Sequence, residues 1–186
     1  MKNMKDRTKN KIILSIVIAA ALFAAAFFGR IVAGRVLPYI VPPSYSKAAD
    51  RKIYDRAEDL TVIQKGRKIS LYRGEEKIWT LPKSVLAQSV ILADIDNDQK
   101  KELTVLCWKR GKFGKHRPSW VKYDDPVYSQ HIYIYEIEDT AVPKWMASDI
   151  GIKARSFRFD DGVLFITDTD GNETGWKWIS WGLTKL

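Results

Sequence analysis

The chain has 186 residues, which allows one ordinary domain and a short accessory segment. Hydrophobic residues make up 46% of it and charged residues 28%, so the composition is not that of a disordered chain. The net charge is +9, but residues 1–35 carry seven Lys and Arg against one Asp, which leaves +3 for residues 36–186. Nucleic-acid binding by the folded part is therefore not expected. A single Cys excludes an intrachain disulfide, and with only two His a Cys-rich or His-rich metal site is not expected.

The N-terminal segment has the pattern of a membrane signal anchor. Residues 12–28 are 17 consecutive uncharged positions, and the run extends to Ala33 if the side chain of Arg30 reaches the headgroups. Basic residues are more numerous before the run than after it, which favours a cytoplasmic N-terminus. We therefore expect a cytoplasmic tail at 1–11 and a single-pass transmembrane helix at 12–33 in the cell membrane. The alternative is a signal peptide cleaved near Ala26, which also exports the rest of the chain.

The next segment has the composition of a linker. Residues 34–47 contain Pro38, Pro42 and Pro43, which stop a helix and favour extended backbone. They predict a Pro-rich linker ahead of an extracytoplasmic domain at 48–186. At the start of that domain, residues 47–58 have a loose helical spacing and predict a short helix.

From residue 60 onward, short runs rich in β-branched and aromatic residues alternate with turn signals such as Asp161-Gly162. This pattern predicts an all-β domain of short antiparallel strands. A strand followed by a Trp-bearing strand also recurs weakly, with Trp79, Trp145 and Trp178. The last two are about 33 residues apart, a spacing typical of propeller blades, and the first spacing is about double that, which the insertion at 109–129 partly explains. The predicted strands are Leu60–Gln64, Lys68–Arg73, Lys77–Leu81, Val85–Ala93, Glu102–Trp108, Gln130–Glu138, Lys144–Ala147, Arg155–Phe159, Val163–Thr167 and Gly175–Ser180.

One acidic segment has the spacing of a cation-binding loop. From Asp94 to Leu103 the chain reads D-I-D-N-D-Q-K-K-E-L, with carboxylates at relative positions 1, 3, 5 and 9. Alternate residues of a tight loop can direct their oxygens towards one hard cation. The segment resembles the calcium loop of FG-GAP/VCBS β-propeller repeats, D-x-D-x-D-G-x-x-D-L, which opens a blade. The resemblance implies calcium bound by Asp94, Asp96, Asp98 and Glu102.

The same segment departs from that pattern. Gln99 stands where the pattern has Gly, and a position that needs positive φ penalises any other residue. Lys100 and Lys101 add positive charge beside the cation. A calcium site and an acidic turn held by internal hydrogen bonds are therefore both open. A propeller has four or more blades, and the domain has room for about three. The sequence therefore leaves three arrangements open: an incomplete propeller-like stack, a sandwich, or closure by a partner or an oligomer.

A second candidate site is basic and aromatic. In residues 108–123 six Lys and Arg alternate with four aromatic side chains, a composition that suits an anionic, partly apolar ligand. The alternative is a surface hairpin with solvated charges. The predicted ligand-binding residues are Lys109, Arg110, Lys112, Lys115, Arg117 and Trp120.

No residue pattern indicates catalysis. His116 and His131 lack a nucleophile motif nearby, and no carboxylate pair can be placed at catalytic distance. The sequence therefore favours a non-catalytic, membrane-anchored extracytoplasmic binding module for an anionic cell-wall polymer or an envelope protein. The alternatives are an accessory subunit of an envelope polymer synthesis or export complex and, ranked last, a hydrolase of envelope polymers that uses Asp124, Asp125 or the Asp94 cluster.

Overall fold

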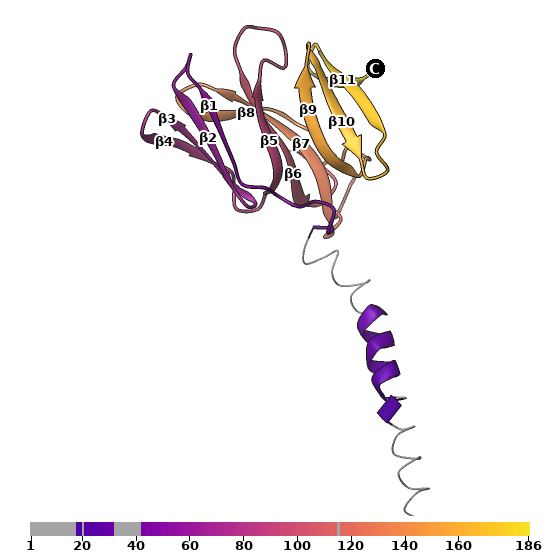
Figure 1. Ribbon diagram of the computed structural model, residues 1–186. Coiled ribbons are helices and arrows are strands. Elements are labelled where there is room, and N and C mark those ends of the chain that lie inside the picture. Colours follow the sequence, from indigo (N-terminus) through magenta and orange to yellow (C-terminus); the bar gives the residue numbers. More distant parts are fainter. Residues whose placement is uncertain (1–17, 20, 32–41, 115) are drawn as a thin grey trace, which may run out of the picture. The chain divides into compact units, whose positions relative to one another are not determined.

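The computed structural model describes residues 18–19, 21–31, 42–114 and 116–186 (Figure 1). Residues 18–19 and 21–31 are helical. Within the described ranges, no helix combines the length and the apolar character needed to cross a membrane. The predicted tail at 1–11, part of the predicted anchor and residues 34–41 of the predicted linker lie outside these ranges. Residues 42–186 form a compact unit of their own.

This unit is built from antiparallel strands (Figure 1). Each of its three sheets has four strands that are consecutive in the chain, so each is a meander. We call them the first sheet (β1–β4), the second sheet (β5–β8) and the third sheet (β9–β12). The strands are β1 Arg51–Asp55, β2 Leu60–Lys65, β3 Lys68–Arg73, β4 Glu76–Thr80, β5 Leu86–Ala93, β6 Glu102–Arg110, β7 Tyr128–Ile137, β8 Ala141–Met146, β9 Ala154–Asp160, β10 Val163–Asp168, β11 Glu173–Ile179 and β12 Gly182–Lys185.

The all-β prediction is confirmed, and every predicted strand overlaps an observed one. The helix predicted at 47–58 is wrong, because residues 51–55 form β1 and pair with β2 in the register Tyr54 to Thr61. Ile53 packs against the hydrophobic cluster between the first and second sheets. Pairing with β2 and this burial outweigh the weak helical spacing of the segment. The short C-terminal strand β12 is a further element that the sequence pattern did not indicate.

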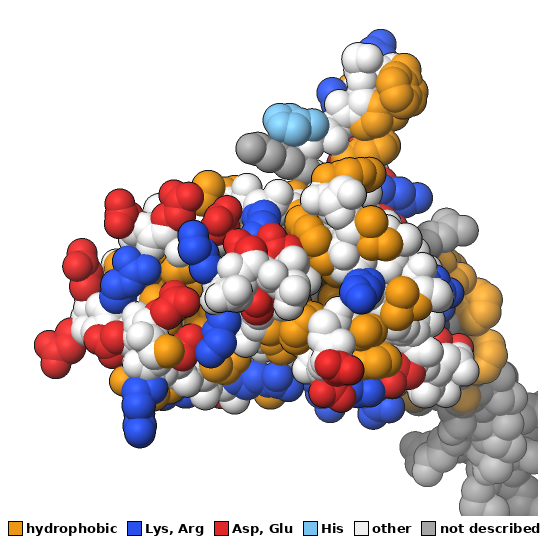
Figure 2. Space-filling model, turned by 90° about the horizontal axis from the view of Figure 1, so that it is seen from above, with side chains coloured by type: hydrophobic (Ala, Val, Ile, Leu, Met, Phe, Trp, Pro, Cys, Tyr) orange, Lys and Arg blue, Asp and Glu red, His pale blue; other side chains and the backbone are white. Residues whose placement is uncertain are grey.

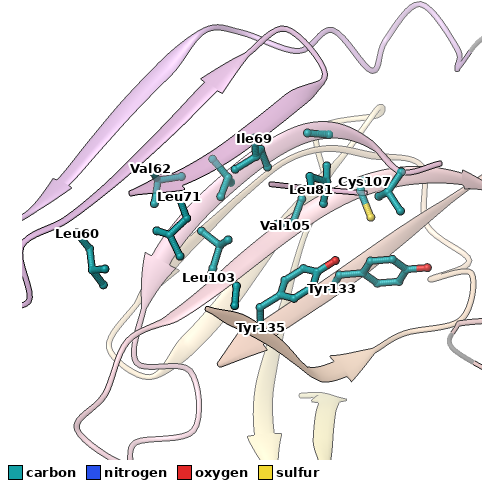
Figure 3. Packing of buried hydrophobic residues seen from close by; sticks show 14 residues of the cluster. Leu60, Val62, Ile69, Leu71, Leu81, Leu103, Val105, Cys107, Tyr133 and Tyr135 are labelled. Atoms are coloured by element: carbon teal, nitrogen blue, oxygen red, sulfur yellow. The ribbon is translucent and has the colours of Figure 1, made fainter. Parts of the chain in front are cut away.

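The second sheet is covered on both faces. Residues 102–108 of β6 are all buried, and five of these seven residues are hydrophobic. Leu103 and Val105 face the first sheet and pack with residues such as Leu71, as Figure 3 shows. Leu106 belongs to a separate cluster with residues of the third sheet, including Leu164. The unit is therefore a stack of three sheets with the second in the middle.

Buried glutamines join the second sheet to the third. The side-chain oxygen of Gln88 accepts hydrogen bonds from Trp108 Nε1 and Gln130 Nε2, both at 2.7 Å. Gln88 Nε2 donates to the carbonyl oxygens of Ala154 at 3.0 Å and Arg155 at 2.9 Å. Gln88 thus uses both donors and its acceptor oxygen, so its buried side chain is fully hydrogen-bonded.

The end of the predicted linker belongs to the β unit. Ser46 is fully buried, and Arg67 donates to its carbonyl oxygen at 2.9 Å and to its hydroxyl at 3.0 Å. The ring of Tyr45 lies against that of Trp108, with centroids 5.9 Å apart. Residues 42–46 are thus held against the sheets, and the folded unit starts at Pro42.

Replacing Gln88 should test how much the glutamine contacts contribute to stability. Gln88→Leu removes the acceptor of the Trp108 and Gln130 N–H groups and the side-chain donor to the Arg155 carbonyl, while the Ala154 carbonyl keeps its bond from Gln130. We expect this loss to lower the free energy of unfolding by about 3 kcal/mol. Urea denaturation of the full-length chain in detergent, followed by Trp fluorescence, measures the loss. Thr184→Ala, on an exposed strand position, serves as the control and should stay within about 0.5 kcal/mol of wild type. Equal stability of all three chains would contradict the prediction.

Candidate functional site

The acidic loop connects β5 to β6 and is held by its own side chains. Asp94 accepts backbone hydrogen bonds from Asp98 at 3.0 Å and from Gln99 at 2.9 Å. Glu102 Oε2 accepts from the backbone N–H of Ile95 at 2.8 Å. Gln99 has a φ of 73°, the left-handed conformation for which the resembling pattern has Gly. The loop therefore keeps this backbone turn although the residue is not Gly.

A lysine from β8, an edge strand of the second sheet, lies among the predicted calcium ligands. Asp94, Asp96 and Glu102 place carboxylate oxygens within 4.8 Å of one another. The ammonium nitrogen of Lys144, on β8, is 2.6 Å from Asp96 Oδ2 and 2.7 Å from Glu102 Oε1. It is also 4.0 Å from Asp98 Oδ2. The positive charge that these carboxylates need is thus supplied by the chain itself.

The electrostatics of the cluster depend on its burial. Glu102 is 1% exposed and Lys144 is 16% exposed. Burial raises the pKa of Glu102, and the hydrogen bonds from Lys144 and Ile95 offset only part of that effect. For Lys144 burial lowers the pKa, but its hydrogen bonds to Asp96 and Glu102 outweigh burial and raise the pKa overall. Lys144 therefore stays protonated at neutral pH, as a permanent counter-charge.

A calcium ion would have to share or take the position of that ammonium group. Asp96 Oδ1 is buried and, within the part of the chain that the structure describes, has no hydrogen-bond partner, so it could still accept a ligand. Asp98 is the most exposed of the three carboxylates near Lys144. Calcium binding by the four predicted ligands stays a prediction.

Removing the ammonium group should show what the lysine does. Lys144→Met leaves Glu102 and Asp96 as uncompensated carboxylates, and we expect a loss of about 3 kcal/mol in the free energy of unfolding. Millimolar calcium should then raise the melting temperature of Lys144→Met much more than that of wild type, because a ligand of the folded state stabilises it by mass action.

Lys177→Met is the matched control, since Lys177 is exposed and lies close to the same loop. It should melt like wild type with and without calcium. A calcium response of wild type as large as that of Lys144→Met would show that the lysine does not occupy the cation position.

The basic aromatic loop connects β6 to β7, at the opposite end of β6 from the acidic loop. Its base is well anchored, because Gly111 donates to the carbonyl oxygen of Val127 at 3.1 Å and Lys112 donates its backbone N–H to Asp124 at 2.8 Å. Gly114 packs so closely on the backbone of Met146 that a side chain there would clash. The ends of the loop are therefore fixed on the second sheet.

The part beyond this base is exposed. Trp120 is 84% exposed and Tyr123 is 78% exposed, and the ammonium of Lys122 lies 5.5 Å from the Tyr123 ring centre. Figure 2 shows hydrophobic, basic and histidine side chains gathered on a part of the unit that projects from the rest. We call residues 116–123 of the loop, most of which are exposed, the lobe.

The predicted ligand-binding residues are not equally available. Lys109 bends back and donates to the carbonyl oxygen of Phe113 at 2.5 Å, and Lys112 pairs with Asp125 at 3.6 Å. Arg110 is exposed and lies 5.4 Å from the ring centre of Tyr128. Residues Arg117 and Trp120 are exposed on the lobe, whereas Lys115 lies outside the described residues. The exposed residues Lys122 and Tyr123 were not in the predicted set. Their alternation with Trp120 in the sequence W-V-K-Y could have indicated that they belong to it.

A buried histidine supports the base of this loop. His131 Nδ1 lies 3.0 Å from the carbonyl oxygen of Ala147, and its Nε2 lies 3.0 Å from that of Gly111. Burial lowers the pKa of His131, and the two backbone hydrogen bonds oppose this only in part. The folded chain therefore binds a proton here less readily than the unfolded chain does.

This difference in proton binding gives stability a pH dependence. An unfolded histidine has a pKa of about 6.5, so as the pH falls below this value the unfolded chain takes up the proton first. The free energy of unfolding should then drop by up to about 1.4 kcal/mol per pH unit until the lowered pKa of the folded state is reached. Urea denaturation from neutral to mildly acidic pH measures this slope.

His131→Gln should remove that part of the slope even if it lowers stability at every pH. His116→Gln, at an exposed position, should keep the slope of wild type. An unchanged slope in His131→Gln would show that other groups cause the acid sensitivity.

The comparisons with known proteins give no relative: no protein-family model, curated protein or solved structure matches the chain. Its candidate function is therefore argued from its own residues. The two loops lie at opposite ends of β6, so they cannot contact the same small ligand. The acidic loop is neutralised in part by Lys144, whereas the basic aromatic loop presents charged and aromatic side chains to solvent.

Proposed function

We propose that the chain is a membrane-anchored extracytoplasmic binding module that carries no catalytic chemistry. In this proposal residues 12–33 are the anchor, the N-terminus is cytoplasmic, and the β unit lies outside the membrane. The basic aromatic loop is the binding surface, and its ligand is an anionic component of the cell envelope. The acidic loop is a structural element that closes one end of the second sheet.

The observation that carries the proposal is the concentration of positive charge at the end of β6 and on the loop that follows it. Residues 109–127, which comprise the last two residues of β6 and this loop, contain six Lys and Arg against two Asp, or +4, whereas the whole of residues 42–186 carries 24 against 21, or +3. The rest of the unit is thus slightly acidic. Exposed Trp120 on the same loop adds an aromatic face. Basic and aromatic groups together favour an anionic ligand with apolar parts.

The carboxylates of the hydrolase alternative are engaged in other contacts. Asp124 accepts backbone hydrogen bonds from Lys112 and Asp125, and Asp125 accepts one from the backbone of Val127 and pairs with the Lys112 ammonium. These contacts fix the base of the loop. This supports a binding role over a catalytic one.

A second candidate, an accessory subunit of an envelope complex, is favoured by a separate surface. Ile179 at the end of β11 is 52% exposed, and Trp181 in the turn to β12 is 81% exposed. Exposed apolar residues at the edge of a sheet can pair with another protein. In this case the chain would co-purify with a partner from detergent, and Trp181→Ser would weaken the association.

Binding to envelope material tests the proposed function. The full-length chain in detergent should bind isolated anionic cell-wall polymer or membrane fractions, and binding should weaken as salt rises. Arg117→Ala combined with Trp120→Ala should reduce the affinity by about tenfold, since both side chains lie on the exposed lobe.

The control variant carries Lys68→Ala and Lys177→Ala, which remove two exposed positive charges outside this loop. It should bind as wild type does. Absence of binding to every fraction, or equal loss in the control, would reject the loop as a specific binding surface.

A further inference from the structure

The base of the basic aromatic loop lies beside the point where the chain enters the β unit. Tyr45 packs on Trp108, which is two residues before the end of β6. On the other side, the backbone N–H of Asp149 donates to the carbonyl oxygen of Lys112 at 2.6 Å. The entry segment and the loop therefore occupy the same end of the unit, and the acidic loop occupies the other.

The length of chain between the predicted anchor and this entry point is short. From Ala33 to Pro42 there are nine residue steps in the sequence, which reach at most about 30 Å even when fully extended. The entry point is therefore always within that distance of the end of the anchor. Tethering keeps the neighbouring loop at a high local concentration at the membrane surface.

The side chains of the lobe suit a lipid surface. Trp and Tyr favour the level of the lipid headgroups, because their rings combine an apolar body with a polar edge. Here Trp120 and Tyr123 are both largely exposed, and Arg117 and Lys122 lie beside them as exposed positive charges. Basic side chains near a membrane are attracted to anionic lipid headgroups.

From this placement we propose that residues 116–123 dock on anionic lipid headgroups of the membrane in which the chain is anchored, and so hold the β unit against it. The inference rests on the proposed anchor and names the ligand of the proposed binding loop. A projecting lobe with exposed rings suits a broad surface better than a single polymer chain, which needs an enclosing groove. A wall polymer as the ligand is the alternative that the experiment must separate.

A reporter on the lobe can measure the docking directly. The full-length chain is reconstituted into vesicles of phosphatidylcholine alone or mixed with phosphatidylglycerol, and an environment-sensitive fluorophore is attached at Ser119→Cys. The native Cys107 is fully buried and does not compete for the label. Docking predicts a blue shift and strong quenching by lipids with spin-labelled headgroups, but only in vesicles that contain phosphatidylglycerol.

The matched reporter at Thr184→Cys, on the exposed face of β12, should be quenched weakly in both kinds of vesicle. Adding Arg117→Ala and Lys122→Ala to the Ser119→Cys chain should lower the docking equilibrium by about tenfold. Equal quenching of the two reporters in phosphatidylglycerol vesicles would overturn lipid docking.

The two proposals fail in different ways. If the fluorophore at Ser119→Cys is not quenched but the loop variants still lose binding to isolated wall polymer, the lipid assignment is wrong. The proposal of a binding module then stands. If the chain binds neither lipid nor polymer, the loop is not a binding surface. If the chain does not insert into vesicles through residues 12–33, the anchor on which both proposals depend is wrong.

Discussion

The burial of the second sheet on both faces is the constraint from which the rest of the structure follows. Water does not reach the middle of this sheet, so every polar group there needs a protein partner. Gln88 and Gln130 meet this need for the contact with the third sheet, and Gln130 Oε1 also accepts the backbone N–H of Ala154 at 2.8 Å. Hydrogen bonds are directional, so they fix the orientation of the third sheet on the second. Hydrophobic contacts alone would not fix this orientation.

Because both faces of the second sheet are buried, most of its charged side chains lie near the two ends of its strands. At one end, Lys144 places an ammonium group between Asp96 Oδ2 and Glu102 Oε1. A covalently attached cation cannot dissociate, and its single charge balances only part of the acidic cluster. At the other end, the longer loop exposes aromatic and basic side chains to solvent, among them Trp120, Tyr123 and Arg117. If the proposed function holds, stability and ligand recognition are separated along one strand, β6.

The sequence predicted the strands well because their signal is local. Alternating apolar residues and turn residues mark each strand without reference to its neighbours. It failed where a distant partner decides the outcome: β1 exists because β2 pairs with it, and Lys144 meets Glu102 across 42 positions of sequence. The ligand set of the basic loop was predicted from composition, and composition does not tell that Lys109 turns back to its own backbone. The sequence left room for about three blade-like units, but it did not decide between a stack and a sandwich or give the order of the sheets.

The attachment of residues 42–46 has a mechanical consequence. A pull on the chain from its N-terminal side reaches the hydrogen bonds between Arg67 and Ser46, and the ring contact of Tyr45 with Trp108, before it reaches any strand. These contacts lie between the load and β1, the strand that would otherwise peel from the edge of the first sheet. A pulling force must therefore break these contacts before it can separate β1 from β2.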